Sequence, residues 1–132
     1  DILSDIDDVE TVSLGKKGAI KVDKIGGMRG NENALGKRTE ESVRQVMLSN
    51  TGRLTYIYNK YLKRNPDLSG KMVVEVVIAA SGDVSSAKLV SSNMNLPEFE
   101  REILNFIRRW KYEQIDQGSV TVNYPLFFNK VG

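Results

Sequence analysis

The chain has 132 residues, of which 40% are apolar and 27% are charged, and its formal net charge is +2. This profile fits one globular domain, and the small, dispersed charge argues against nucleic acid as the main ligand. The absence of cysteine and histidine excludes disulfides, thiol nucleophiles, Cys/His zinc sites and the usual neutral-pH proton shuttle. No run of about 18 apolar residues predicts a transmembrane helix. Because the chain begins with Asp1, we expect it to come from a longer protein.

Residues 1–38 differ from the rest because they are rich in glycine and carry an acidic start followed by basic residues. Two short β-like runs, residues 9–14 and 19–22, flank a Gly-Lys-Lys-Gly turn and predict a small hairpin. Residues 25–33 are glycine-rich and are predicted to be a flexible linker. Two interpretations of the segment stay open: a hairpin docked on the domain, or a mostly disordered tail.

A long helix is predicted from Thr39 to Asn65. Thr39 is a good N-cap residue, and Asn65-Pro66 ends the pattern. Asn50 falls on the apolar stripe, so a bend or break there is an alternative to one continuous helix. The stripe consists of apolar residues at three- and four-residue steps: Val43, Val46, Met47, Leu54, Ile57, Tyr58 and Tyr61.

Two strands and a second helix follow. Residues 70–79 alternate between two faces, residues 84–92 form a more polar strand, and the short turn with Gly82 makes the pair an antiparallel hairpin. Asn95 is predicted to cap a helix that continues to residue 111, with Pro97 in its first turn. Trp110 falls on the apolar face of this helix, so we expect it in the core rather than in a nucleic-acid or lipid patch.

The C-terminal residues 119–128 have the two-residue period of a strand with one buried face. The buried stripe runs from Val120 to Phe128, and the other face carries Thr121, Asn123, Pro125 and Phe127. Proline has no N–H to donate to a neighbouring strand, so the sequence predicts that this strand lies at a sheet edge. An open edge is a template to which a partner peptide can add.

The order and spacing of several short motifs resemble the TonB C-terminal domain family over about residues 40–128. The motifs are Gly70-Lys-Met-Val-Val-Glu-Val-Val-Ile78, Ser81-Gly-Asp-Val84, Val90-Ser-Ser92, Arg108-Arg-Trp-Lys-Tyr112 and the C-terminal strand. Thr55-Tyr-Ile-Tyr58 and the run from Leu62 to Gly70 are similar to the AgmX/PglI-type subgroup of gliding-motility and related envelope proteins. One departure is Ile57, where members of that subgroup often carry cysteine, and we expect it to be a core aliphatic residue.

The resemblance implies an α+β fold of α-β-β-α-β order, with a three-stranded antiparallel sheet, a packed helix and a preceding long helix. The expected boundaries are an N-terminal segment 1–38, a domain 39–128 and a tail 129–132. The resemblance also implies a periplasmic location, a tether to the inner membrane through an upstream region, and transmission of force or signal from a motor to a periplasmic or outer-membrane protein.

The predicted function is non-catalytic capture of an extended partner peptide along residues 119–128. The predicted contact residues are Thr121, Asn123, Pro125 and Phe127, together with Tyr56, which points away from the apolar stripe of its helix. No catalytic, cofactor or metal site is predicted, since the acidic residues are expected to be solvent-exposed surface charges. Two alternatives stay open: a scaffold that forms a homodimer through the same edge, and a small nucleic-acid-binding domain.

Overall fold

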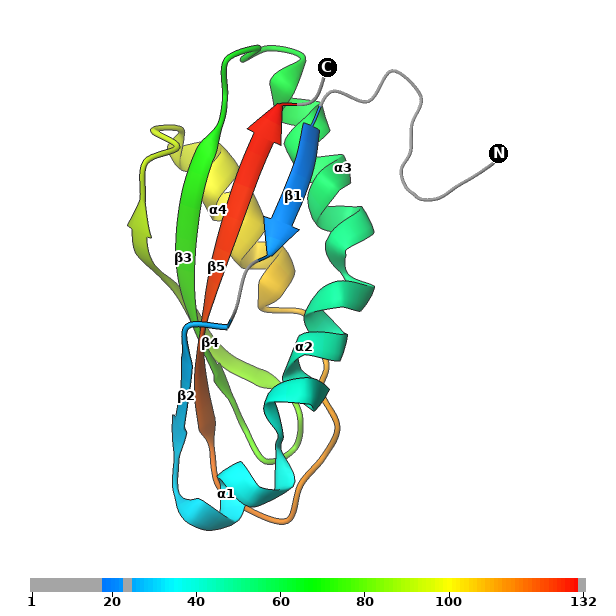
Figure 1. Cartoon of the computed structure of the whole chain (residues 1–132), viewed down its shortest axis with the longest axis vertical. Helices are drawn as coiled ribbons and strands as arrows, with labels where there is room; N and C mark the ends of the chain where they lie inside the picture. The colour runs from blue at the N-terminus through cyan, green and yellow to red at the C-terminus, as the bar shows by residue number, and fades with distance from the viewer. Residues whose placement is uncertain (1–17, 23–24, 131–132) are drawn as a thin grey trace, which may run out of the picture.

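The computed structural model describes residues 18–22 and 25–130 and shows an antiparallel sheet with α2, α3 and α4 on one face (Figure 1). The elements in chain order are β1 (Gly18–Val22), β2 (Gly27–Gly30), α1 (Glu32–Lys37), α2 (Glu40–Ser49), α3 (Thr51–Leu62), β3 (Gly70–Ile78), β4 (Val84–Ser92), α4 (Pro97–Ile107) and β5 (Val120–Lys130). The strand order is β1-β5-β3-β4, and β2 also pairs with β5. The predicted α+β class is confirmed, and β1, β2 and α1 are additions to the predicted order.

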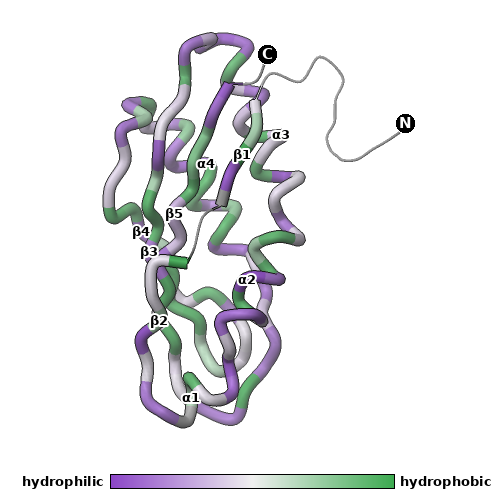
Figure 2. The backbone as a smooth tube through the Cα atoms, in the orientation of Figure 1, coloured by the Kyte–Doolittle hydropathy of each residue, from purple (hydrophilic) through white to green (hydrophobic). Residues whose placement is uncertain are grey.

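Strands β3 and β5 form the centre of the sheet, and they pair antiparallel from Gly70↔Phe128 to Ile78↔Val120. The residues that face the helices are wholly buried, and their neighbours on the opposite face are half-buried. Apolar and polar stretches follow each other along both strands in Figure 2. The alternation of buried and half-buried residues is the two-residue period expected of a sheet that packs against helices on one side only.

The predicted long helix is divided into α2 and α3 at Asn50. Thr39 is the N-cap of α2 as predicted, and its hydroxyl oxygen accepts a hydrogen bond from the Ser42 amide at 3.0 Å. At the break, the Asn50 side chain donates to the Val46 carbonyl at 2.8 Å. This bond satisfies a carbonyl that the interrupted helix leaves without its regular partner.

Helix α4 begins one position later than the predicted cap requires. Its N-cap is Leu96, which makes no side-chain capping bond, so the prediction for Asn95 is wrong. Asn95 instead has a φ of +59°, a left-handed conformation that asparagine tolerates better than most residues. Trp110 is 2% exposed and packs edge-on against Tyr124, as predicted for a core residue.

Phe128 lies at the centre of an aromatic cluster between the sheet and two helices. Its ring centroid is 5.2 Å from those of both Tyr58 on α3 and Phe99 on α4, in edge-to-face arrangements. All three side chains have 0% exposure. Edge-to-face aromatic pairs add to the free energy gained from burial, so this cluster joins β5 to both helices.

The predicted edge position of the C-terminal strand is wrong. β5 lies between β3 on one side and β1 and β2 on the other. The predicted linker 25–33 is wrong in part, because it contains β2 and the start of α1, and Ile25 is buried at 6% exposure. Of the predicted hairpin, residues 9–17 lie outside the described residues, and β1 pairs with β5.

Pro125 lies inside the sheet, between the part of β5 that pairs with β1 and the part that pairs with β2. β1 ends opposite Leu126 and β2 begins opposite Asn123, so Pro125 falls between the two. The Asn123 carbonyl accepts from the Gly26 amide at 2.9 Å, which shows that this residue directs its backbone groups towards β2. Residues two apart in a strand direct these groups to the same side. The missing N–H of Pro125 therefore points to the side of β1 and β2 and not to β3.

We predict that Phe128→Ala destabilises the fold far more than Phe127→Ala. The first change removes a fully buried ring and leaves a cavity, at a cost of about 3–5 kcal/mol. The second removes a half-buried ring from the opposite face, at a cost of about 1 kcal/mol or less. Free energies of unfolding from denaturant titrations measure both. Equal losses for the two neighbours would contradict the assignment of the faces.

Candidate functional site

The β5 edge that the sequence predicts to bind a partner is occupied by the chain's own N-terminal segment. β1 pairs antiparallel with β5 from Gly18↔Lys130 to Val22↔Leu126, and β2 pairs from Gly27↔Asn123 to Gly30↔Val120. An extended segment thus lies along most of β5. β1 and β2 add to the edge of β5 as a partner peptide does in strand addition, but they belong to the same chain.

Gly18 sits in a close-fitting seat made by α3. A Cβ atom at this position would lie 2.5 Å from two ring carbons of Tyr58 and 2.9 Å from a methyl carbon of Leu62. The Tyr58 hydroxyl donates to the Leu68 carbonyl at 2.6 Å, which fixes the ring. Burial raises the pKa of Tyr58 to about 12, so the ring is neutral at physiological pH. Only glycine fits this seat.

The remaining residues of β1 follow the alternation of the sheet. Ile20 lies opposite Phe128 and packs against the core, whereas Ala19 and Lys21 on the other face are exposed. The pattern from Gly18 is therefore a glycine, an outward residue and an inward aliphatic residue. Backbone pairing holds the strand, and the two inward positions fit it to the helices.

β2 is attached to the domain through side chains of its own and of α1. Arg29 Nη2 lies 2.8 Å from the Glu75 carboxylate on β3, two strands away. The Asn31 side chain caps α1 by accepting from the Ala34 amide at 2.8 Å, and Ala34 is fully buried. β2 therefore continues directly into a helix that is part of the core.

Arg38, which follows α1, holds this part of the chain in place. It is 2% exposed, and its guanidinium donates to the Glu113 carbonyl at 2.8 Å and to the Ala79 carbonyl at 3.2 Å. The guanidinium carbon lies 5.8 Å from the centre of the Tyr112 ring. Burial lowers the pKa of Arg38, but arginine remains charged in proteins. These bonds join the end of α1 to the loops after β3 and before β5.

Four of the five predicted contact residues lie together on the open face of β5. Thr121, Asn123, Pro125 and Phe127 are half-buried and point away from the helices. The Lys71 ammonium lies 5.2 Å from the centre of the Phe127 ring, and Lys21 is the neighbour of Phe127 on the other side. These four are thus next to the occupied edge, where their side chains flank any strand that pairs with β5.

The fifth predicted contact residue, Tyr56, is not brought together with the other four. It lies on α3, is 58% exposed, and has the Arg53 guanidinium 5.1 Å from its ring centre. Its neighbour two positions on, Tyr58, faces β1. Two residues on a helix are about 200° apart around the axis, so Tyr56 points away from the β5 edge.

The sequence prediction missed Gly18 and Tyr58 as parts of this edge. Gly18 was assigned to a turn because Gly15-Lys-Lys-Gly18 resembles one. A signal was present in the alternation of Gly18 with Ile20, which fits an inward-facing pattern. Tyr58 was assigned correctly to the core, but its contact with β1 joins segments 40 residues apart and has no local signature.

The opposite edge of the sheet, β4, is poorly suited to adding a strand. Register shifts between Val73/Val74 and Val77/Ile78 interrupt its ladder with β3. Arg108 Nη2 donates to the Ala87 carbonyl of β4 at 2.9 Å, so a backbone acceptor is already used. Bulges and charged side chains are the usual protection of an edge against further pairing.

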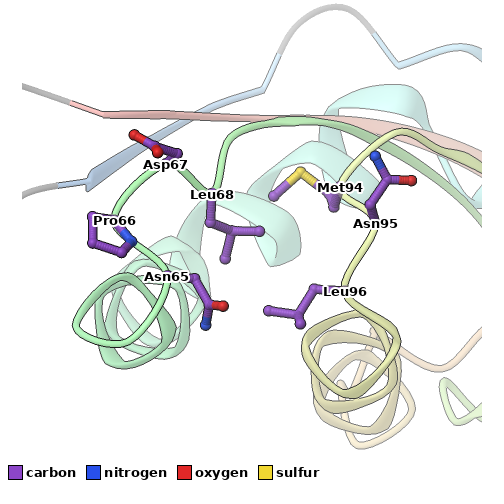
Figure 3. Close-up of a pocket in the computed structure, with 7 residues that line it drawn as sticks. All are labelled: Asn65, Pro66, Asp67, Leu68, Met94, Asn95 and Leu96. Carbon is purple, nitrogen blue, oxygen red and sulfur yellow. The ribbon is translucent and has the colours of Figure 1, made fainter.

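An open pocket lies between the α3–β3 loop and the segment before α4 (Figure 3). It is lined by Asn65, Pro66, Asp67, Leu68, Met94, Asn95 and Leu96. Asp67, the one charged lining residue, lies 3.3 Å from the Lys130 ammonium. Within residues 18–22 and 25–130, no group of three or more acidic side chains is placed to hold a metal ion. In the same ranges, no helix is both long and apolar enough to cross a bilayer.

We predict that the ion pairs of Glu75 stabilise the fold at neutral pH and are lost in acid. Hydrogen bonds from Arg29, and then from Lys88, hold the pKa of Glu75 below its ordinary value. The stabilisation is therefore complete above the unfolded-state pKa, about 4.3, and is lost as the pH falls through the lower folded-state value. Unfolding titrations of wild type and Glu75→Gln should show a stability difference that is constant above pH ~5 and shrinks below ~4. A difference independent of pH would contradict this role.

A family model described as Gram-negative bacterial TonB protein C-terminal matches residues 62–129. The match covers the end of α3 together with β3, β4, α4 and β5, whereas β1, β2, α1 and α2 lie outside it. Neither a curated protein nor a solved structure matches the chain. The matched residues cover more than half of the chain and include the strand whose edge is described above. The chain therefore belongs to the TonB C-terminal domain family, whose members are non-catalytic, periplasmic protein-interaction domains of envelope energy transduction.

Proposed function

We propose that the chain is the interaction domain of an envelope machine of the energy-transduction or gliding-motility type, and that it captures an extended partner segment by strand addition to β5. The upstream part of such a protein would tether it to the inner membrane and its motor. The AgmX/PglI-type motifs, Thr55-Tyr-Ile-Tyr58 among them, support the gliding-type assignment. Backbone pairing would provide affinity, and the residues beside the edge would provide specificity.

The observation that carries this proposal is that β5 already accepts a strand at this edge. β1 pairs with β5 over five consecutive residues although it is remote in sequence. The edge therefore has the backbone geometry and the inward space that an added strand needs. A partner segment would take the place of β1 and would meet the same surfaces.

In this proposal β1 leaves β5 while β2 stays attached. The described pairs of β1 reach Leu126 and those of β2 start at Asn123, so the two strands pair with separate parts of β5. β2 is held by Arg29 and by its continuation into α1, which Arg38 anchors.

We predict that locking β1 to β5 abolishes partner capture. Ala19 and Asn129 are direct cross-strand neighbours on the open face. Their Cα atoms should be about 5.5 Å apart, within the range of a disulfide. Because the chain has no cysteine, Ala19→Cys with Asn129→Cys introduces one defined bond. Affinity for the envelope partner, measured by calorimetry, should be lost in the oxidised form and restored by reduction.

A matched lock on β2 serves as the control. Met28→Cys with Val122→Cys joins β2 to β5 at another cross-strand pair, and neither residue is a predicted contact. Oxidation of this variant should leave partner affinity unchanged. The site itself can be followed by backbone chemical shifts of residues 126–130, the part of β5 that pairs with β1, which should move during titration with the partner. An oxidised β1 lock that still binds its partner fully would show that capture occurs elsewhere. Sedimentation at rising concentration separates this function from the homodimer alternative.

A further inference from the structure

The seat of Gly18 is a feature of the β5 edge that strand addition alone does not require. Backbone pairing accepts almost any residue, whereas this position excludes every side chain. The would-be Cβ contacts of 2.5 Å with Tyr58 are far inside van der Waals distance. The contacted atoms belong to a ring that has 0% exposure and a hydrogen-bonded hydroxyl. The ring has no room to move aside.

The position of the seat along the ladder is also fixed. Gly18 lies opposite Lys130, and two residues later Ile20 lies opposite Phe128 and packs on the core. A one-residue slip would turn Ile20 towards solvent, and a two-residue slip would drive Ile20 against Tyr58. A strand on this edge must therefore present glycine and an aliphatic residue two positions apart, in antiparallel orientation to β5.

We propose that the β5 edge is selective for a Gly-X-aliphatic segment, because Tyr58 and Leu62 leave no room for a side chain at the glycine position. β1 is the intramolecular copy of that segment. The proposal rests on strand addition as the function of the edge and names the kind of partner that fits it. The partner is an extended protein segment with glycine two residues before isoleucine or a residue of similar shape. β1 competes with it, since a segment in the same chain has an effective concentration of about millimolar.

The test uses the full chain with β1 released and a peptide supplied in its place. Gly18→Val places a branched side chain against Tyr58 and should free the edge. The probe is a fluorescent peptide with the sequence of residues 14–24, Leu-Gly-Lys-Lys-Gly-Ala-Ile-Lys-Val-Asp-Lys. The matched control peptide carries valine in place of the glycine that corresponds to Gly18. Fluorescence anisotropy gives both affinities, and chemical shifts of residues 126–130 locate binding.

We expect the glycine peptide to bind the Gly18→Val chain at least roughly tenfold more tightly than the valine peptide, because overpacking against a fixed ring is costly. The wild-type chain should bind the glycine peptide much more weakly, because β1 occupies the edge. Equal affinity of the released chain for the two peptides would leave strand addition intact and overturn the glycine selectivity. Equal affinity of the wild-type and released chains for the glycine peptide would overturn competition by β1.

A second variant releases β1 in a different way and serves as a control in case Gly18→Val damages the fold. Ala19→Pro removes an N–H that faces β5 but adds nothing towards Tyr58, since Ala19 is on the exposed face. Both variants should keep the circular dichroism and the core chemical shifts of wild type. If neither peptide binds a folded Ala19→Pro chain, strand addition at this edge fails together with the selectivity. Binding of only the glycine peptide supports both.

Discussion

The backbone of β5 must find hydrogen-bond partners on both of its sides, and this requirement organises the molecule. One face of the strand is covered by α2, α3 and α4 (Figure 1), and unpaired backbone groups in such a place are costly. β3 supplies one side over the whole length of the pairing, and β1 and β2 supply the other. The family match begins at residue 62 and does not include β1 or β2. Segments outside the matched region thus complete the sheet of the matched region.

Strands and helices with strong periodicity could be predicted from the sequence, because the same residues that set the period also make the core. The alternation of β5 and the stripe of α4 are examples, and Phe128, Phe99 and Trp110 are buried as predicted. The cap of α4 could not be predicted, because Asn95 satisfies both a capping pattern and a left-handed turn. Only the surrounding chain decides between these conformations.

The edge position of β5 was predicted incorrectly from a valid rule about proline. The rule concerns one missing N–H, and its cost depends on the side of the strand to which that N–H points and on what lies there. The glycines of the N-terminal segment led to incorrect predictions of a turn and a flexible linker for a related reason. Gly18 and Gly30 are required by close contacts with Tyr58 and with the Ser119 carbonyl, not by flexibility. A glycine that allows close approach looks the same in sequence as one in a linker.

Tension applied through the chain ahead of Gly18 would meet the sheet in a particular way. β1 is antiparallel to β5 and starts at the Lys130 end, so a pull on its N-terminal side separates the ladder one pair at a time from that end. The separation proceeds towards Val22, which lies opposite Leu126. After β1, the load reaches β2, α1 and the buried guanidinium of Arg38. The N-terminal cover thus consists of two elements that tension would reach one after the other.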